Sequence, residues 1–320
     1  MSPFKKVTVF GAGVMGHSLA LLHAQAAEAV CLVDTSPSAL QAAAPLMRNA
    51  LETLDAAGEL KESPAQIMER ISFHEHAEDC LSDTELVIEA ISENPDIKHR
   101  FFAGLPSCAA EGTPGASALV ASNTSTLDIF ALAPESLHPR LFAAHHFVPP
   151  HIIPLVEIIG SPAAGAGDLE RLQRHYRAAG AVPVPLKKFT PGFVVNRLQF
   201  AIHQEMFKLM EEGVVDAAEL DLAVKASLGI RIAALGIVKR LDFAGLDLVL
   251  GNMRRLGCER LPAQLRTLVE EGHTGIKAGQ GFYDYGQRTV EDICRKRDDD
   301  MLRIRSVLRE LGLLDREGEA

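Results

Sequence analysis

The segment from His145 to Ile158, HHFVPPHIIPLVEI, contains the side chains of this sequence that are best suited to acid–base chemistry. It holds three histidines, three prolines and one glutamate, Glu157, which stands in an otherwise apolar run. A carboxylate inside a buried strand is costly unless it is paired, and a histidine is its natural partner. Such a pair would hold the imidazole in one tautomer and would suit a general base near neutral pH. The alternative for Glu157 is an edge-strand residue that faces water.

A metal site is the other chemistry that this segment could support. The three histidines do not match a ligand spacing on a helix, and the two prolines between His146 and His151 indicate a turn. Zinc would need further ligands, and no cysteine is close in sequence. We therefore predict no metal here and expect His146 and His151 to be turn or surface residues. The scattered cysteines predict reduced thiols in a cytoplasmic protein: Cys31, Cys80, Cys108, Cys258 and Cys294.

A second site is predicted near the start, where VTVFGAGVMG is a strand-like run followed by glycines in G-x-G-x-x-G order. Such glycines allow a tight turn, close approach to a pyrophosphate and close strand–helix packing, and the helix N-terminus favours the phosphates. The alternative is a glycine-rich turn without a ligand, but a strand before, a helical pattern after and a later acid favour a dinucleotide. The predicted cofactor-binding residues are Gly11, Gly13, Val14, Met15, Gly16 and Asp34.

Asp34 lies 18 residues beyond Gly16, close to the spacing of the acid that binds the adenosine ribose. A carboxylate there would accept from the ribose hydroxyls and repel a 2′-phosphate. No arginine follows at once, since the sequence continues DTSPS, so NAD is favoured over NADP.

Polar side chains also follow two later strand-like runs. ALVASNTSTLDI places Asn123 and Ser125 at a strand end, and LFAAHH places His145 and His146 at another. In a doubly wound sheet, ligands bind beyond the carboxyl ends of the strands. Taken alone, SNTST is also typical of a hydroxyl-rich turn that caps a helix.

Short β-rich runs that alternate with helical patterns or loops continue to about residue 188 and predict a mostly parallel sheet. From Thr190 the apolar spacing becomes helical, with Thr190 as an N-cap before Pro191. A further helix is predicted with Asp216 and Glu219 at capping-box spacing and Gly229 as its stop. The fold class is therefore α/β: a Rossmann-type, doubly wound, mostly parallel sheet over residues 1–188, followed by an all-α domain over residues 189–320.

Composition limits the partners. The chain has 320 residues, 47% of them hydrophobic, and a formal charge of −10, which argues against nucleic acid as a partner. It contains no run of about 18 apolar residues, so no membrane span is expected. The start of the sequence lacks the pattern of a signal peptide.

Several motifs occur in one order along nearly the whole chain: VTVFGAGVMG, LVIEAISEN, SNTST, HHFVPPHIIPLVEII, TPGFVVNRLQFAIHQE, DFAGLDL and GIKAGQGFYDY. In this order they resemble the L-3-hydroxyacyl-CoA dehydrogenases, including the λ-crystallin/L-gulonate 3-dehydrogenase and carnitine dehydrogenase branches. The resemblance implies an NAD-dependent enzyme whose helical domain forms a homodimer. A λ-crystallin-like, non-catalytic NAD-binding protein is the alternative from another class.

The resemblance also implies roles for single residues. His145 would be the catalytic acid–base and Glu157 its carboxylate partner, while Ser125 and Asn196 would contact the reacting substrate oxygen. The ribose and nicotinamide side of the cofactor would be contacted by three residues, Glu93, Lys98 and Asn123. Two positions depart from the family pattern: Val148 replaces the usual asparagine, and Ile237 replaces a proline. The change at Val148 would alter either the orientation of the nicotinamide and His145 or the substrate contacts. The change at Ile237 would alter a helix start.

The stretch SLGIRIAALG predicts the substrate class. Arg231 matches a basic residue of the λ-crystallin-like branch that faces a free carboxylate, and a guanidinium binds carboxylates in bidentate fashion. The alternative is an exposed arginine near a helix terminus. PPHIIPLVEII also resembles a relative that oxidises a pyridine carboxylate. We therefore expect a small hydroxy acid with a free carboxylate, and an L-3-hydroxyacyl-CoA thioester is the runner-up.

Overall fold

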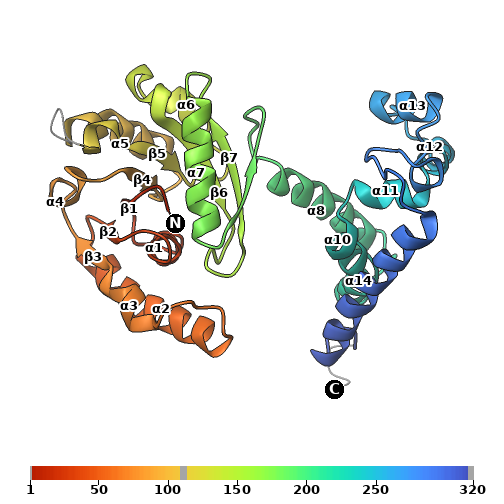
Figure 1. Ribbon diagram of the computed structural model, residues 1–320, viewed down its shortest axis with the longest axis horizontal. Helices are drawn as coiled ribbons and strands as arrows, with labels where there is room; N and C mark the ends of the chain where they lie inside the picture. The colour runs from red at the N-terminus through yellow and green to blue at the C-terminus, as the bar shows by residue number, and fades with distance from the viewer. Residues whose placement is uncertain (1, 109–113, 316–320) are drawn as a thin grey trace. The chain divides into compact units, whose positions relative to one another are not determined.

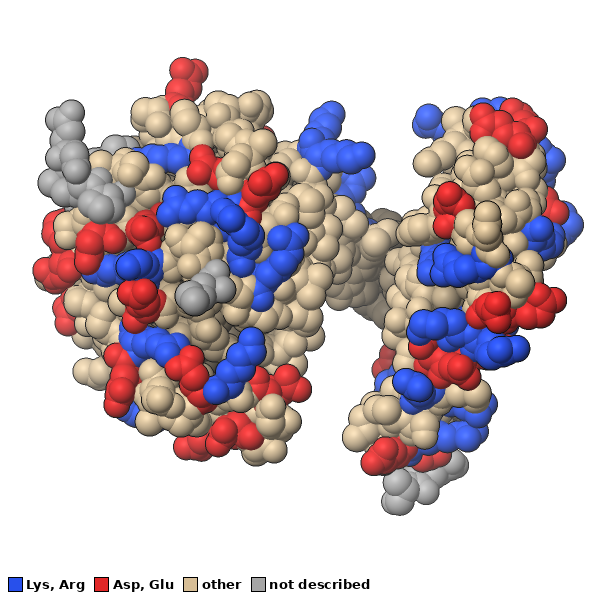
Figure 2. All heavy atoms as spheres, in the orientation of Figure 1, with Lys and Arg blue, Asp and Glu red and all other residues tan. Residues whose placement is uncertain are grey.

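The computed structural model describes residues 2–108 and 114–315. The chain forms two compact units, residues 1–200 and 201–320. The division falls inside helix α8 (Val195–Glu211), later than the boundary expected between residues 188 and 189. Acidic and basic side chains are interspersed on the visible face of both units (Figure 2).

The first unit is built on one sheet of eight strands in the order β3-β2-β1-β4-β5-β6-β7-β8 (Figure 1). Neighbouring strands are parallel except β6 and β7, which are antiparallel. The predicted α/β fold class is therefore confirmed, with the short β3 as an additional strand. The strands are β1 (Lys6–Phe10), β2 (Ala29–Val33), β3 (Ile71–His74), β4 (Leu86–Glu89), β5 (Leu119–Ser122), β6 (Leu141–His146), β7 (Leu155–Gly160) and β8 (Val182–Pro185).

Helices cover both faces of this sheet because alternate strand residues point to opposite faces. Val9 packs into a core with α1, α2 and α7, whereas Phe10 packs into a second core with α5 and α6. This two-sided burial is why the strands read as continuous apolar runs. The helices are α1 (Gly16–Ala24), α2 (Pro37–Ala56), α3 (Pro64–Glu69), α4 (Glu78–Leu81), α5 (Pro95–Cys108), α6 (Ile129–Leu132) and α7 (Ala166–Ala178).

The second unit is helical, as predicted, and the described residues 201–315 add only two isolated β-bridges. Two small apolar cores lie around Leu246 and Ile276. The described part of the chain contains no helix that combines the length and the hydrophobicity of a transmembrane span. The helices after α8 are α9 (Ala217–Ala223), α10 (Ile230–Leu235), α11 (Lys239–Ala244), α12 (Leu246–Arg255), α13 (Ala263–Glu270) and α14 (Val290–Glu310).

Two predicted helix ends were wrong. Helix α8 begins at Val195 rather than Pro191, because Gly192 and Phe193 have φ angles of 76° and 51° and cannot belong to a right-handed helix. Asp216 does cap α9, as predicted, but Gly229 does not end the helix. Its backbone is helical, with φ −56° and ψ −50°, and the chain continues through a π-helical turn into α10. Gly236, with φ 76°, ends this helix instead.

Candidate active site

The His145–Glu157 pair forms because β6 and β7 are antiparallel neighbours. Their register places His145 directly opposite Glu157, and directly opposed residues point to the same face of a sheet. His145 Nδ1 lies 2.9 Å from Glu157 Oε2. The side chains are 5% and 2% exposed, so the pair is held in a low-dielectric environment. The proline-containing segment between the strands includes a turn, as expected.

Glu157 is also bound by the beginning of α8. Its Oε1 accepts the backbone N–H groups of Val194 and Val195 at 3.0 and 3.1 Å. Free N–H groups at a helix N-terminus favour a negative charge, so this contact stabilises the carboxylate. An ionised carboxylate can only accept, which assigns the Nδ1 proton to His145. The Nε2 of His145 is then free to take a proton.

Two phenylalanine rings fix the orientation of the His145 imidazole. Phe147 lies 4.5 Å from it in a tilted arrangement, and Phe193 lies 4.9 Å away and is stacked. Phe193 is fully buried, and among the described residues it is the one non-glycine residue with a positive φ. The strained backbone at Phe193 therefore coincides with a ring contact on the acid–base pair.

A cavity of about 350 Å³ lies in front of His145. Besides His145, it brings together five of the residues predicted from the sequence, namely Met15, Glu93, Asn123, Ser125 and Asn196. Val148 also lines it and is 63% exposed, so the residue that replaces the family asparagine faces the site. The remaining lining residues are Ala90, Ile91, His146 and Phe147. Ala90 and Ile91 were missed, although their position directly after β4 could have indicated them.

Glu93 organises the SNTST loop. Its Oε1 accepts the hydroxyl of Thr124 at 2.7 Å and the backbone N–H groups of Ser125 and Thr126 at 2.8 and 3.1 Å. Burial opposes ionisation, but the Thr124 hydrogen bond, the charge of Lys98 and the backbone donors lower the pKa of Glu93 to about 2. The hydroxyl of Ser125 also donates to this oxygen at 3.2 Å, so it must rotate to reach a substrate.

We predict that Glu93 makes stability depend on acid pH. Its folded pKa of about 2 lies below the ordinary 4.5, so its contribution is complete above about pH 4.5 and is lost as the pH falls toward 2. Glu93→Gln should therefore unfold with a flatter pH dependence over this window, measured as the urea midpoint. The exposed Glu59→Gln variant serves as the control and should follow the wild type.

Lys98 does not line this cavity. Its Nζ is bound to the buried Glu89 and lies 3.2 Å from Glu93 Oε2, and its side chain is 1% exposed. Ser122 donates to the second oxygen of Glu89. Lys98 therefore lies behind Glu93, and its ammonium supports the loop that Glu93 holds.

The expectation of a turn or surface position for His146 was wrong. His146 is the last residue of β6 and is 3% exposed, and burial lowers its pKa to about 3. Its Nδ1 contacts two acceptors, Asn123 Oδ1 at 3.0 Å and Ala144 O at 2.9 Å, so Nδ1 carries the proton. Because Asn123 uses its oxygen here, its amide NH₂ remains available to the cavity. His151, by contrast, lies in the predicted turn and contacts Ser18 Oγ at 2.6 Å.

The glycine motif forms a second cavity, of about 620 Å³. A Cβ at Gly11 would lie 2.5 Å from Ala90 O, and one at Gly16 would lie 1.6 Å from Gly11 O, whereas Gly13 faces open space. Asp34 lines this cavity and accepts the N–H of Ala12 at 2.7 Å. A tight turn, an open approach at Gly13 and a carboxylate fit a bound dinucleotide.

The two cavities share Ala90 and Ile91 and are therefore adjacent. Met15 lines the His145 cavity, and Val14 is 70% exposed beside it in the loop. A ligand that extends from Asp34 past the glycine turn would thus reach the front of His145. The structure also brings Glu75, Ile97, Arg100 and Phe101 to the Asp34 cavity, which no local sequence pattern had indicated.

Arg231 lies in the second unit, at the start of α10. It is half-buried, and its guanidinium donates to the hydroxyl of Ser227 at 2.7 Å. The residues that line the His145 cavity all belong to the first unit, and Arg231 is not one of them. Its predicted contact with a substrate carboxylate stays a prediction.

The histidines of the 145–151 segment do not form a metal-binding group in the part of the chain that the structure describes. Four of the predicted reduced thiols are free. Cys108 is outside the set of described side chains, so its predicted thiol is not assessed. The cytoplasmic location stays a prediction.

Comparison with known proteins gives matches over both units. Residues 6–189 match the model of the 3-hydroxyacyl-CoA dehydrogenase NAD-binding domain, and residues 192–285 match that of its C-terminal domain. The chain is 29% identical over 310 residues to the 5-formyl-3-hydroxy-2-methylpyridine 4-carboxylate 5-dehydrogenase of Mesorhizobium japonicum, covering 95% of this chain and 98% of that protein. It is 33% identical over 298 residues to the human mitochondrial hydroxyacyl-coenzyme A dehydrogenase, covering 88% and 91%. The crystal structure of an Archaeoglobus fulgidus 3-hydroxyacyl-CoA dehydrogenase superposes with a TM-score of 0.77 at 29% identity, covering 97% and 99%.

Proposed function

Because the chain belongs to the 3-hydroxyacyl-CoA dehydrogenase family, we propose that it oxidises or reduces a small hydroxy acid that bears a free carboxylate. Membership makes it an NAD-dependent oxidoreductase that acts on a CH–OH group, as the sequence predicted. One observation carries the proposed chemistry: the His145–Glu157 pair opens onto a cavity that adjoins the glycine-turn cavity.

In the proposed reaction, NAD supplies the hydride chemistry. In the oxidation direction, His145 Nε2 takes the proton of the substrate hydroxyl, and Glu157 stabilises the imidazolium that forms. The hydroxyl of Ser125 and the amide of Asn196 donate to the oxygen as negative charge develops on it. In the reduction direction, protonated His145 returns the proton. Phe147 and Phe193 keep the imidazole in place during both steps.

The free carboxylate is proposed from Arg231, which matches the basic residue of the λ-crystallin-like branch. A guanidinium can hold a carboxylate through two parallel hydrogen bonds. The Mesorhizobium relative, by its name, acts on a pyridine carboxylate, which is a small ring acid. A CoA thioester needs no such cation at the acyl end.

The runner-up substrate is a 3-hydroxyacyl-CoA thioester. The human relative and the Archaeoglobus structure both carry that activity in their names. The first candidate has a free carboxylate and the second has a thioester in its place. One experiment can therefore distinguish them.

We predict that Arg231→Ala lowers kcat/KM for free hydroxy acids by about 10- to 100-fold, because a hydrogen bond to a charged group contributes about 1.5–3 kcal/mol. NADH formation would be followed spectroscopically with free 3-hydroxybutyrate, L-gulonate, L-carnitine, a hydroxymethyl-pyridine carboxylate and 3-hydroxybutyryl-CoA. The exposed Arg266→Ala variant of the same unit is the matched control and should behave as wild type. Turnover of the thioester alone, unaffected by Arg231→Ala, would contradict the free-acid proposal and favour the acyl-CoA reaction.

We also propose a homodimer that forms through the helical domain. None of the residues of α8, all of which the structure describes, is buried, although the helix carries several apolar side chains. Phe200 and Phe207 are 63% and 56% exposed and lie seven residues apart, on one helix face. Apolar surface of this kind marks an interaction site.

We predict that Phe207→Asp raises the dimer dissociation constant at least about tenfold, because each change acts twice across a two-fold interface. Sedimentation velocity over a concentration series would measure it. Leu256→Asp, at an apolar residue that is 82% exposed and lies outside α8, is the control. A wild-type monomer at micromolar concentration would contradict the proposal.

A further inference from the structure

Three metal-ligating side chains meet near the β3 edge of the sheet, away from the His145 cavity. Cys31 lies in β2, His74 is the last residue of β3, and Cys80 lies in α4. One ligand atom from each lies within 4.8 Å of the other two. Among the residues that the structure describes, this is the one group of three or more histidine, cysteine or acidic side chains with such a geometry.

The parallel register explains why two of these side chains meet. Cys31 pairs with Ser72 across β2 and β3, so Ser72 and, two residues later, His74 point to the same face as Cys31. The hydroxyl of Ser72 lies 3.5 Å from Cys31 Sγ and 2.9 Å from His74 Nε2. After β3 the chain turns into the short helix α4, which brings Cys80 over the same face.

We propose that Cys31, His74 and Cys80 bind one Zn²⁺ ion. Two thiolates and one imidazole are ligands that zinc prefers, and a water molecule can complete the tetrahedron. Zn–S and Zn–N bonds of about 2.3 and 2.0 Å place the ligand atoms of a tetrahedral site roughly 3.5 Å apart. The distances between the three ligand atoms in the structure, at most 4.8 Å, exceed this tetrahedral spacing by no more than about 1.3 Å. Rotation of the side chains is therefore sufficient to close the site.

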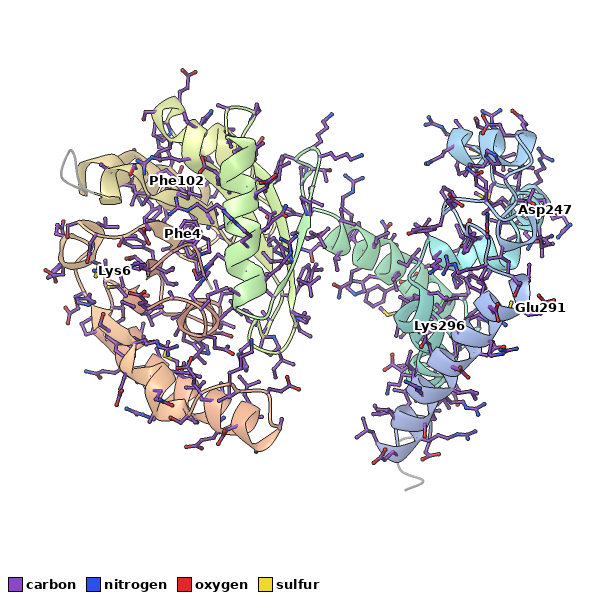
Figure 3. All side chains as sticks on the ribbon, in the orientation of Figure 1. Phe4, Lys6, Phe102, Asp247, Glu291 and Lys296 are labelled. Atoms are coloured by element: carbon purple, nitrogen blue, oxygen red, sulfur yellow. The ribbon has the colours of Figure 1, made fainter. Side chains whose placement is uncertain are left out.

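The charges and the exposure of the cluster fit this ion. Cys31 and Cys80 are 4% and 0% exposed, and two thiolates with one Zn²⁺ are neutral together, as a buried site requires. The nearby ammonium of Lys6, labelled in Figure 3, forms an ion pair with Asp83. On the other side, Ser72 is exposed and His74 is half-buried, so an ion can enter from solvent at the sheet edge.

The proposed ion would stabilise the fold and take no part in the redox step. None of its three ligands lines either the Asp34 cavity or the His145 cavity. The segment is nevertheless close to the cofactor side, because the carbonyl of His74 accepts the N–H of Asp34 at 3.1 Å and Glu75 lines the Asp34 cavity. Zinc would thus hold the segment that leads from β3 into α4.

Cobalt is a suitable probe because its complexes with thiolates absorb in the near ultraviolet and its tetrahedral sites absorb in the visible range. Tag-free, reduced and chelator-treated protein would be titrated with Co²⁺ and then with Zn²⁺. We expect one Co²⁺ per chain with both sets of bands, displacement by Zn²⁺, and a higher midpoint of thermal unfolding with Zn²⁺. Cys31→Ser and Cys80→Ser should abolish the thiolate band.

His74→Ala is the deciding variant. His74 is half-buried, so removing its imidazole should not disturb folding, whereas Cys31 and Cys80 are buried in the core. We expect at least a tenfold weaker Co²⁺ affinity with an unchanged circular dichroism spectrum. Cys258→Ser and His76→Ala, both at exposed positions, are the matched controls and should bind like the wild type. A wild-type protein without a thiolate–cobalt band, or a band that survives all three ligand substitutions, would overturn the proposal and leave the cluster as buried thiols of the core.

Discussion

Replacing His145 by alanine should lower kcat by about 10²- to 10⁴-fold, because a positioned general base contributes about that factor. The affinity for NAD should stay close to that of the wild type, since the Asp34 cavity does not include His145. Steady-state kinetics and isothermal titration with NAD would measure the two quantities separately. A variant that binds NAD and has lost turnover would exclude the non-catalytic, crystallin-like role.

Two further variants make this test specific. Glu157→Gln keeps the size of the side chain but removes the charge that holds the His145 imidazole, so kcat should fall by about 10²-fold or more. His151→Ala changes a histidine of the same segment that lies in the turn and contacts Ser18, and it should retain activity within a few-fold. Equal losses in His145→Ala and His151→Ala would show a general structural effect and would contradict the assignment.

Lys98→Met should destabilise the protein by about 3–5 kcal/mol, the cost of removing one partner of a buried ion pair. Glu89 is fully buried, and its remaining contacts, from Ile91 N–H and the Ser122 hydroxyl, do not neutralise its charge. The free energy of unfolding would be measured by urea denaturation at neutral pH. Lys61→Met, at an exposed lysine, is the matched control and should change stability by less than about 0.5 kcal/mol.

The double variant Glu89→Gln/Lys98→Met distinguishes the charge from the packing. Without the carboxylate, no buried charge is left uncompensated, so the double variant should be more stable than Lys98→Met alone. A double variant that is less stable than either single variant would mean that Lys98 stabilises the fold by packing. It would also remove the reason to place Lys98 behind Glu93 as a charged support.

The sequence alone determined the features that depend on local pattern. Seven of the eight strands were recognised as β-rich, mostly apolar runs, and β3 was missed because its sequence ISFH alternates apolar and polar residues over only four positions. The glycines at 11, 13 and 16 and the acid at 34 were readable because a tight strand–helix turn restricts residue type wherever it occurs. The motif order gave the family, and the comparisons confirm it.

Only the tertiary structure decided which side chains meet across strands. The hairpin register places His145 opposite Glu157, and the start of α8 supplies the donors to its second oxygen. The same packing buries His146, which a local reading had placed at the surface.

Burial by distant elements likewise pairs Lys98 with Glu89, a contact that no local pattern had indicated, and the cofactor contact of Lys98 stays a prediction. Cys31 and Cys80 showed no metal spacing in the sequence because β2, β3 and α4 bring them together only after folding. These contacts join residues that lie far apart in the chain, so they depend on which strands and helices become neighbours when the whole chain folds.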